Sequence, residues 1–186
     1  ANAQIDGAPI GELEAMSYYV IIATAGHDTT SSSTAGGMLA LLQHPEELQK
    51  VINNPDLMSL MVDEAIRWTS PVKHFMRYPE RAYELRGKTI EAGSPVMLLY
   101  PSGNRDEEVF DRPQSFLADR RPNRHLAFGH GAHHCLGNLL AKMEIRFLYE
   151  AMFNRMKTFE LIGEPRWVES TFVSGLKTLP VRITPK

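Results

Sequence analysis

The sequence has little of what marks several protein classes. It contains one cysteine among 186 residues, so no intrachain disulfide can form and a reducing compartment is expected. The formal net charge is only -2, which gives no electrostatic reason to expect nucleic acid as a partner. No apolar run reaches the length of a membrane span, and no signal-peptide pattern is present. We therefore expect a cytoplasmic protein without a membrane segment in this chain and without a nucleic-acid partner.

The composition is otherwise that of an ordinary globular chain. Hydrophobic residues make up 43% and charged residues 23% of the sequence, and the length suffices for one domain with a core. The chain opens at Ala1 without an initiator methionine. We therefore expect it to be a piece of something longer.

Apolar periodicity predicts a mainly helical chain that begins with one long helix, Glu12–Gln43. The helix ends at His44 because the residue before a proline resists the helical conformation. Residues 25–34 in its middle are a run of poor helix formers. Two interpretations follow: a loop between two helices, or a buried helix with small side chains against which something flat can lie.

Shorter elements are predicted along the rest of the chain. We expect helices over residues 45–53, 56–68 with Asp56 as N-cap, and 137–153, in which Leu139, Leu140, Met143, Phe147 and Leu148 share one face. Strands are expected over 95–100, 157–162 and 179–183, with turns at Gly87 and Gly93. Residues 101–124 are predicted to be irregular coil.

The segment 128–137 combines three glycines, three histidines and the only cysteine. Cys135 directly precedes a predicted helix, whose free N–H groups and partial positive charge stabilise a thiolate. A thiolate is a strong donor to haem iron. Two other interpretations of Cys135 are a buried small hydrophobe and a zinc ligand. Four histidines lie within ten residues of it (His125, His130, His133, His134), but the second pair typical of a structural zinc site is missing.

This segment resembles the haem-binding signature of the cytochrome P450 family, which has a phenylalanine, two glycines, a basic residue and the ligating cysteine at this spacing. The resemblance covers essentially the whole chain and is greatest to soluble bacterial members such as terpene hydroxylases. It implies a mainly α fold with small β-sheets, the C-terminal portion of the cytochrome P450 fold. Residues 1–186 would form a single part of that domain, and the N-terminal half of the domain is absent from this chain. It also implies haem b, bound through Cys135, with Phe128 and Gly129 beside the thiolate.

Two further motifs occur in the same order as in that family. Glu64 and Arg67 lie three apart on one helical face, and the family's matching pair is buried against an arginine of the coil before the cysteine loop. Arg120 matches that arginine best, and Arg121 is the neighbouring alternative.

The other motif, Asp28 with Thr29, resembles the family's oxygen-binding helix. There a hydroxyl orients oxygen and an acid feeds a proton relay. The alternative is that Asp28 is the N-cap of a helix.

Binding residues are carried over from the resemblance by position. Arg77 and His133 match groups that hold the haem propionates, His125 matches a further residue near them, and His130 and His134 are expected to be surface histidines. The positions that match substrate contacts are small or apolar and suggest a hydrophobic substrate, although core packing explains them too: Thr24, Ala25, Val72, Phe172 and Val173.

The resemblance implies a haem-thiolate monooxygenase, or the C-terminal fragment of one, that inserts one oxygen atom of O2 into an apolar small molecule. A ferredoxin-type electron donor is expected to dock near Cys135, where the basic candidates are Arg105, Arg124, Lys142 and Arg146. Without the N-terminal half, haem is expected to be absent or loosely held, and a partner chain or self-association to cover the long helix. The alternatives are an inert, self-associating fragment and a haem-binding module without oxygen activation.

Overall fold

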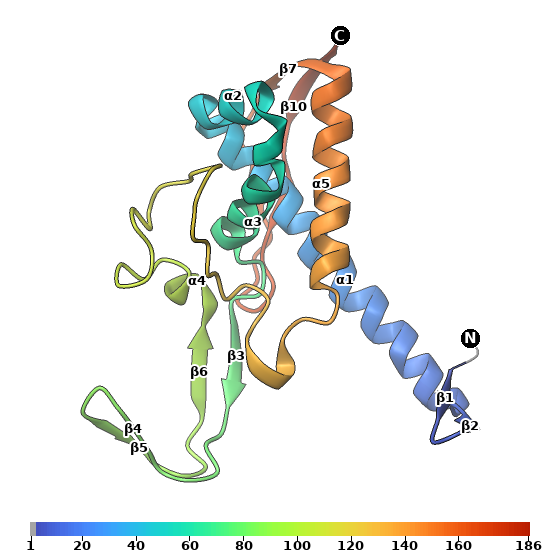
Figure 1. The fold of residues 1–186 in the computed structure, drawn as a ribbon, viewed down its shortest axis with the longest axis vertical. Helices are drawn as coiled ribbons and strands as arrows, with labels where there is room; N and C mark the ends of the chain where they lie inside the picture. The colour runs from blue at the N-terminus through green and yellow to red at the C-terminus, as the bar shows by residue number, and fades with distance from the viewer. Residues whose placement is uncertain (1–2) are drawn as a thin grey trace.

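The computed structural model describes residues 3–186, which form helices and short two-stranded sheets around one helical core (Figure 1). The helices are α1 (Glu12–Gln43), α2 (Pro45–Asn53), α3 (Met58–Thr69), α4 (Tyr100–Gly103) and α5 (Asn138–Arg155). Short 3-10 turns span Pro55–Leu57 and Gly131–His133. The expectation of a mainly α fold with small sheets is confirmed.

The sheets are antiparallel pairs of short strands. Their bounds are β1 (Gln4–Ile5) with β2 (Ala8–Pro9), β3 (His74–Arg77) with β6 (Val96–Leu99), β4 (Tyr83–Leu85) with β5 (Lys88–Ile90), β7 (Met156–Leu161) with β10 (Val181–Pro185), and β8 (Arg166–Trp167) with β9 (Leu176–Thr178). Gly87 and Gly93 both have a φ of +74°, a left-handed conformation in which glycine is favoured, which fits the turns expected there.

Helix α1 is continuous through the run of poor helix formers, so the interpretation as a loop is wrong. Its hydroxyls donate to carbonyls four residues earlier: Thr29 Oγ1 to Ala25 O at 2.7 Å and Thr34 Oγ1 to Thr30 O at 2.8 Å. These bonds satisfy the polar side chains inside the helix. The second interpretation also predicts burial. Within the run only Ser33 is buried, and burial becomes continuous after it, from Gly36 to Leu41.

The core lies where α1, α3 and α5 meet. Leu41, Met61, Ala65, Ile145 and Tyr149 are almost completely buried there. The helices α1 and α3 approach closely because Gly36 and Gly37 lack side chains. A Cβ at Gly37 would lie 2.5 Å from the Ala65 Cβ, and one at Gly36 would lie 2.4 Å from Thr69 Oγ1.

Several element bounds differ from the sequence-based expectation: β10, for example, begins at Val181 and not at residue 179. Asp56 does not cap the third helix: its own N–H donates to the Asn54 side chain, and the 3-10 turn Pro55–Leu57 precedes α3. The strand expected over residues 95–100 is shorter, because Tyr100 already begins α4. Proline near the N-terminus of a helix, here Pro101, costs no hydrogen bond and favours the helical start.

The apolar face predicted for α5 is not the face that packs in this chain. Ile145 and Tyr149 are buried, whereas the five residues grouped by periodicity are between 47% and 71% exposed. The N-terminal half of α1 shows the same exposure at Leu13, Ile21 and Ile22. Within residues 3–186, no helix is both long enough and apolar enough to cross a membrane.

Candidate functional site

The loop before α5 presents the only thiol of the chain. Gly129 and Gly131 have φ values of +71° and +72°, so the loop needs glycine at both positions. The Cys135 N–H donates to Phe128 O at 2.8 Å, and the Asn138 side chain donates to Cys135 O at 2.7 Å. Cys135 is half-buried and lies two residues before Gly137, the N-cap of α5. The loop therefore holds the sulfur at the positive end of a helix.

The histidines around Cys135 point to separate partners. His134 Nδ1 is 3.3 Å from Gly129 O, and His125 Nε2 is 3.4 Å from Asp63 Oδ1, while His130 and His133 are exposed. Across the described chain, no three or more His, Cys, Asp or Glu side chains converge as a metal site would require. The geometry gives the zinc interpretation no support.

Glu64, Arg67 and Arg120 meet in a buried ion cluster. Arg67 binds both carboxylate oxygens of Glu64 at 2.7 Å, and Arg120 Nε donates to Glu64 Oε2 at 2.9 Å. Glu64 and Arg67 are 0% exposed and Arg120 is 5% exposed. Arg121 is exposed, so Arg120 is the arginine that the structure places against the pair.

Sequence reasoning missed Asn104, which joins this cluster to the cysteine loop. Its carbonyl accepts from Arg67 Nη1 at 2.7 Å, and its side chain donates to Ser70 Oγ at 2.7 Å. Its Oδ1 accepts from the Leu126 N–H at 2.6 Å, just before the loop. Asn104 lies in the irregular coil, where no periodic pattern singles it out.

Asp28 and Thr29 lie well inside α1, so the N-cap interpretation of Asp28 is wrong. The Asp28 carboxylate is exposed, with Oδ1 at 2.8 Å from His27 Nδ1. Thr29 is half-buried. Its hydroxyl hydrogen is committed to Ala25 O, which leaves the oxygen lone pairs available as acceptors.

Three of the five predicted substrate contacts come together. Val72 and Val173 form an antiparallel bridge, and Phe172 O accepts from the Lys73 N–H at 2.8 Å. Gly175 follows Phe172 and Val173 on the same loop and lies close to Ser32 of α1. A Cβ on Gly175 would be only 2.1 Å from Ser32 Oγ. Ser32 follows Thr29 by one helical turn. The other two predicted contacts, Thr24 and Ala25, are exposed on α1.

Arg77 lines a cavity of 370 Å³ beside the strand pair β3–β6. Its remaining lining is mostly apolar and comes from Leu98, Leu99, Tyr100, Leu126 and His130. His130, expected to be a surface histidine, therefore belongs to this lining, whereas His133 does not. The cavity combines one cation with apolar walls. A flat ring that carries carboxylates at its edge requires this combination for binding.

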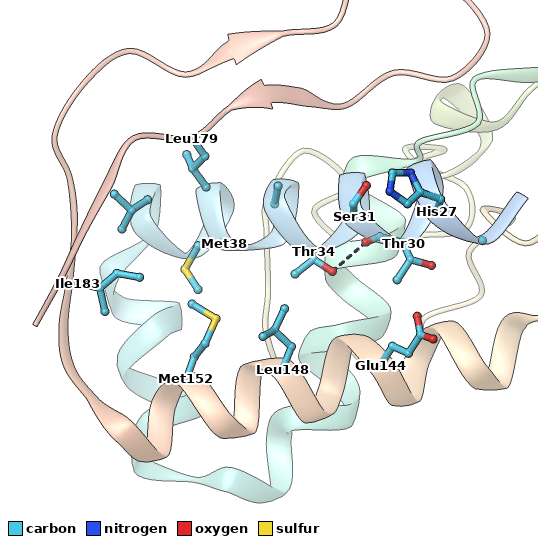
Figure 2. A pocket seen from close by; sticks show the side chains of 13 residues that line it. His27, Thr30, Ser31, Thr34, Met38, Glu144, Leu148, Met152, Leu179 and Ile183 are labelled. Atoms are coloured by element: carbon cyan, nitrogen blue, oxygen red, sulfur yellow. Dashed lines mark hydrogen bonds between the residues drawn. The ribbon is translucent and has the colours of Figure 1, made fainter. Parts of the chain in front are cut away.

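A larger groove of 620 Å³ runs between α1, α5 and β10 (Figure 2). His27, Thr30 and Glu144 line its polar end, and Met38, Leu148, Met152, Leu179 and Ile183 line the rest. None of the residues proposed from the sequence as site residues lines this groove.

The residues present fit a haem. Cys135 offers one soft sulfur donor, and Leu136 next to it is 93% exposed, so an apolar surface adjoins the thiol. Arg77 supplies a cation beside an apolar cavity. The buried His125 Nδ1 has no hydrogen-bond partner within residues 3–186 and stays free to donate or accept.

Comparisons with known proteins point to one family. The family model described as cytochrome P450 matches residues 10–180. Cytochrome P450-terp of Pseudomonas sp is 50% identical over 99% of this chain and 43% of its own length. The steroid C26-monooxygenase of Mycolicibacterium smegmatis is 35% identical over 99% of this chain and 46% of its own length.

The crystal structure of CYP108D1 from Novosphingobium aromaticivorans superposes with a TM-score of 0.93 at 46% identity, covering all of this chain and 45% of that one. The chain thus spans about half the length of the curated relatives it matches. The half-buried thiol before α5 and the buried Glu64–Arg67–Arg120 cluster lie within the residues 10–180 that the family model matches. We conclude that the chain belongs to the cytochrome P450 family.

Proposed function

We propose that this chain forms the C-terminal part of a haem-thiolate monooxygenase that inserts one oxygen atom of O2 into an apolar organic substrate. The observation that carries the proposal is the loop that holds Cys135 at the start of α5. One relative of the same family is named a monooxygenase. We assign residues 1–186 as a whole to the C-terminal part of a cytochrome P450 domain. We also propose that the protein is cytoplasmic.

The cofactor assigned to the site is haem b, whose iron supplies the activation of dioxygen when it is bound. Cys135 is its proposed ligand, and Gly129 lets the loop backbone turn beside it. Phe128, half-buried at the start of the loop, is the proposed shield of the sulfur against water, a role that would tune a thiolate–iron bond. Arg77, His133 and His125 are the proposed partners of the propionates.

Asp28 and Thr29 are the proposed proton-handling pair on α1. Because the Thr29 hydroxyl donates to Ala25 O, its oxygen is left to accept a hydrogen bond from a water. The Asp28 carboxylate is exposed to solvent beside His27 and can pick up protons there. Oxygen activation consumes protons, so this pair would deliver them to the oxygen-binding side.

An apolar substrate is proposed from the side chains near Thr29. Phe172 and Val173 lie on the loop that touches α1 through Gly175, and Val72, from the segment before β3, pairs with Val173. Thr24 and Ala25 add small side chains on the helix. The steroid C26-monooxygenase reported above has an apolar substrate class in its name.

An electron-transfer partner of the ferredoxin type is proposed to dock near Cys135. Three of the four basic candidates already bind within this chain. Lys142 pairs with Asp63 at 2.6 Å, Arg146 with Glu150 at 3.4 Å, and Arg105 donates to Trp68 O at 3.0 Å.

Arg124 is the fourth candidate. It is exposed, and within residues 3–186 it makes no side-chain hydrogen bond or ion pair. We therefore assign the first contact with an acidic donor to Arg124.

A spectrum of the reduced carbonyl complex tests the proposed function. The chain is mixed with haem, reduced and exposed to carbon monoxide. We expect the red-shifted Soret band of a thiolate-bound carbonyl, and we expect Cys135→Ser to abolish it. A histidine-type carbonyl spectrum would contradict the thiolate assignment. Failure to take up haem would favour an inert fragment.

A second candidate function follows from the exposed apolar side of α1 and α5. Large apolar side chains exposed together are unfavourable in water unless something covers them. This observation favours a chain that associates, either with a separate N-terminal partner chain or with a second copy of itself. Size-exclusion chromatography of the purified chain distinguishes association from a monomer.

A further inference from the structure

Two neighbouring carboxylates on α3 face different surroundings. Glu64 is completely buried in the arginine cluster, whereas the Asp63 side chain is 27% exposed and faces the segments on either side of the cysteine loop. No motif of the sequence singles out Asp63, and the haem-binding residues proposed above do not include it.

A single oxygen of Asp63 holds both flanks of the loop. Lys142 Nζ, on α5 after the loop, lies 2.6 Å from Asp63 Oδ1. His125 Nε2, in the coil before the loop, lies 3.4 Å from the same atom. The His125 side chain is only 5% exposed, so this contact is shielded from water. The loop is thus tied at its entrance and its exit to one point on α3.

Both partners of Asp63 also contact Phe128. The His125 and Phe128 ring centroids are 5.7 Å apart at an interplanar angle of 49°, and Lys142 Nζ lies 5.7 Å from the centroid of the Phe128 ring. A cation over an aromatic face is attracted by the ring quadrupole. Because Phe128 O accepts the Cys135 N–H at 2.8 Å, the contacts run from Asp63 to the thiol-bearing residue.

The charges fit this arrangement. Burial would raise the pKa of Asp63, but the hydrogen bond with His125 and the hydrogen bond and charge of Lys142 outweigh it and lower this pKa. The carboxylate is therefore ionised at neutral pH. Removing its charge would leave Lys142 without its nearest anion among the described residues, and it would weaken the contact with His125, whose only side-chain hydrogen-bond partner among those residues is Asp63.

We propose that Asp63 is a positioning residue that acts through His125 and Lys142 to fix Phe128, and so sets the exposure and orientation of the Cys135 thiol. The relevance of this positioning to haem ligation rests on the proposed function. The contact chain itself lies entirely within this chain's own residues.

Alkylation of the only cysteine tests the proposal directly. Cys135 is the sole cysteine, so the rate of iodoacetamide labelling of the haem-free chain reports on this thiol alone. We expect Asp63→Asn to change that rate several-fold, Asp63→Glu to restore much of it, and Lys142→Gln to change it in the same direction. Asp56→Asn is the matched control: it makes the same substitution next to α3, at an exposed carboxylate.

The double variant separates one contact chain from two independent effects. If Asp63 acts through Lys142, Asp63→Asn combined with Lys142→Gln should label at the rate of the stronger single variant. Effects that multiply in the double variant, or an Asp63→Asn rate equal to that of Asp56→Asn, would overturn the proposal. Circular dichroism at the labelling temperature shows which variants are folded. If Asp63→Asn is unfolded, the labelling rate of Lys142→Gln tests the proposal in its place.

A spectroscopic readout connects the positioning to the ligand. In the haem-loaded chain, the share of carbonyl complex with the thiolate-type Soret band should fall in Asp63→Asn and recover in Asp63→Glu. An unchanged share would contradict the positioning role. Labelling needs no haem, so a chain that takes up no haem would count against the proposed function while the labelling rates still decide the role of Asp63.

Discussion

The two halves of α1 have the same backbone and opposite surroundings. Residues 36–41 are buried against α3 and α5, whereas the half that carries Leu13, Ile21 and Asp28 is exposed. The buried half belongs to the core and packs against α3, the helix that carries Glu64 and Arg67. The difference teaches that this chain holds together the cysteine side of the proposed site and leaves the oxygen side, with Asp28 and Thr29, largely without packing partners of its own.

The largest effect is expected in the buried cluster on the cysteine side. Arg120→Ala should lower the free energy of unfolding by about 3–5 kcal/mol, because it leaves part of the buried Glu64 charge unpaired. Arg121→Ala, at the exposed neighbour, should change it by less than about 0.5 kcal/mol. Urea denaturation measures both. Equal losses in the two variants would mean that the cluster does not hold this side together.

A matched pair of leucines tests the comparison within α1. Leu41→Ala should cost about 2–5 kcal/mol of unfolding free energy, since Leu41 is 0% exposed in the core. Leu13→Ala, with Leu13 82% exposed, should cost less than about 0.5 kcal/mol. The same denaturation experiment applies. A large loss in Leu13→Ala would show that the N-terminal half of α1 is covered, by a second copy for example.

Acid should weaken the tie between α3 and the cysteine loop. The pKa of Asp63 is lowered in the folded chain, so its contribution to stability is present above the ordinary value of 3.8 and is lost as pH falls through the folded pKa. We expect the stability difference between the native chain and Asp63→Asn to be constant near neutral pH and to shrink below about pH 4. Unfolding midpoints across pH measure it; a difference that grows on acidification would reverse the sign.

Substitutions in the exposed half of α1 are expected to have the smallest effect on stability and a measurable effect on assembly. Ile21→Glu should reduce self-association at a cost in unfolding free energy of less than about 0.5 kcal/mol. Ile52→Glu, on α2 and 41% exposed, is the control that adds the same charge elsewhere. Sedimentation velocity measures the assembly state. If both variants dissociate the chain equally, net charge and not the α1 face controls association.

The family resemblance, carried by local motifs, explains what could be predicted from the sequence. Spacing alone places Glu64 and Arg67 on one helical face and glycines before Cys135, whereas the burial of the pair and the role of the thiol are what the resemblance implies. Asn104 and the Asp63–His125–Lys142 contacts join segments far apart in the chain, and no local period marks such contacts.

Periodicity also could not choose between the two sides of α5. It identified an apolar face, but the side chains buried in this chain are Ile145 and Tyr149. An apolar face indicates that a partner is needed and does not say whether that partner lies in the same chain. Motif position, by contrast, favoured Arg120 over the alternative Arg121, and Arg120 is the one that donates to Glu64 in the structure.

Gly36 and Gly37 lie where α1 crosses α3, so a tilt of α1 would turn the helix about these two residues. At a rise of about 1.5 Å per residue, Thr29 lies about 12 Å along the helix from Gly37. A tilt of about 5° at the crossing therefore displaces Thr29 by about 1 Å, which is enough to make or break a hydrogen bond. The position of the Thr29 hydroxyl is thus sensitive to how closely α1 and α3 pack at Gly36 and Gly37, two turns further along the same helix.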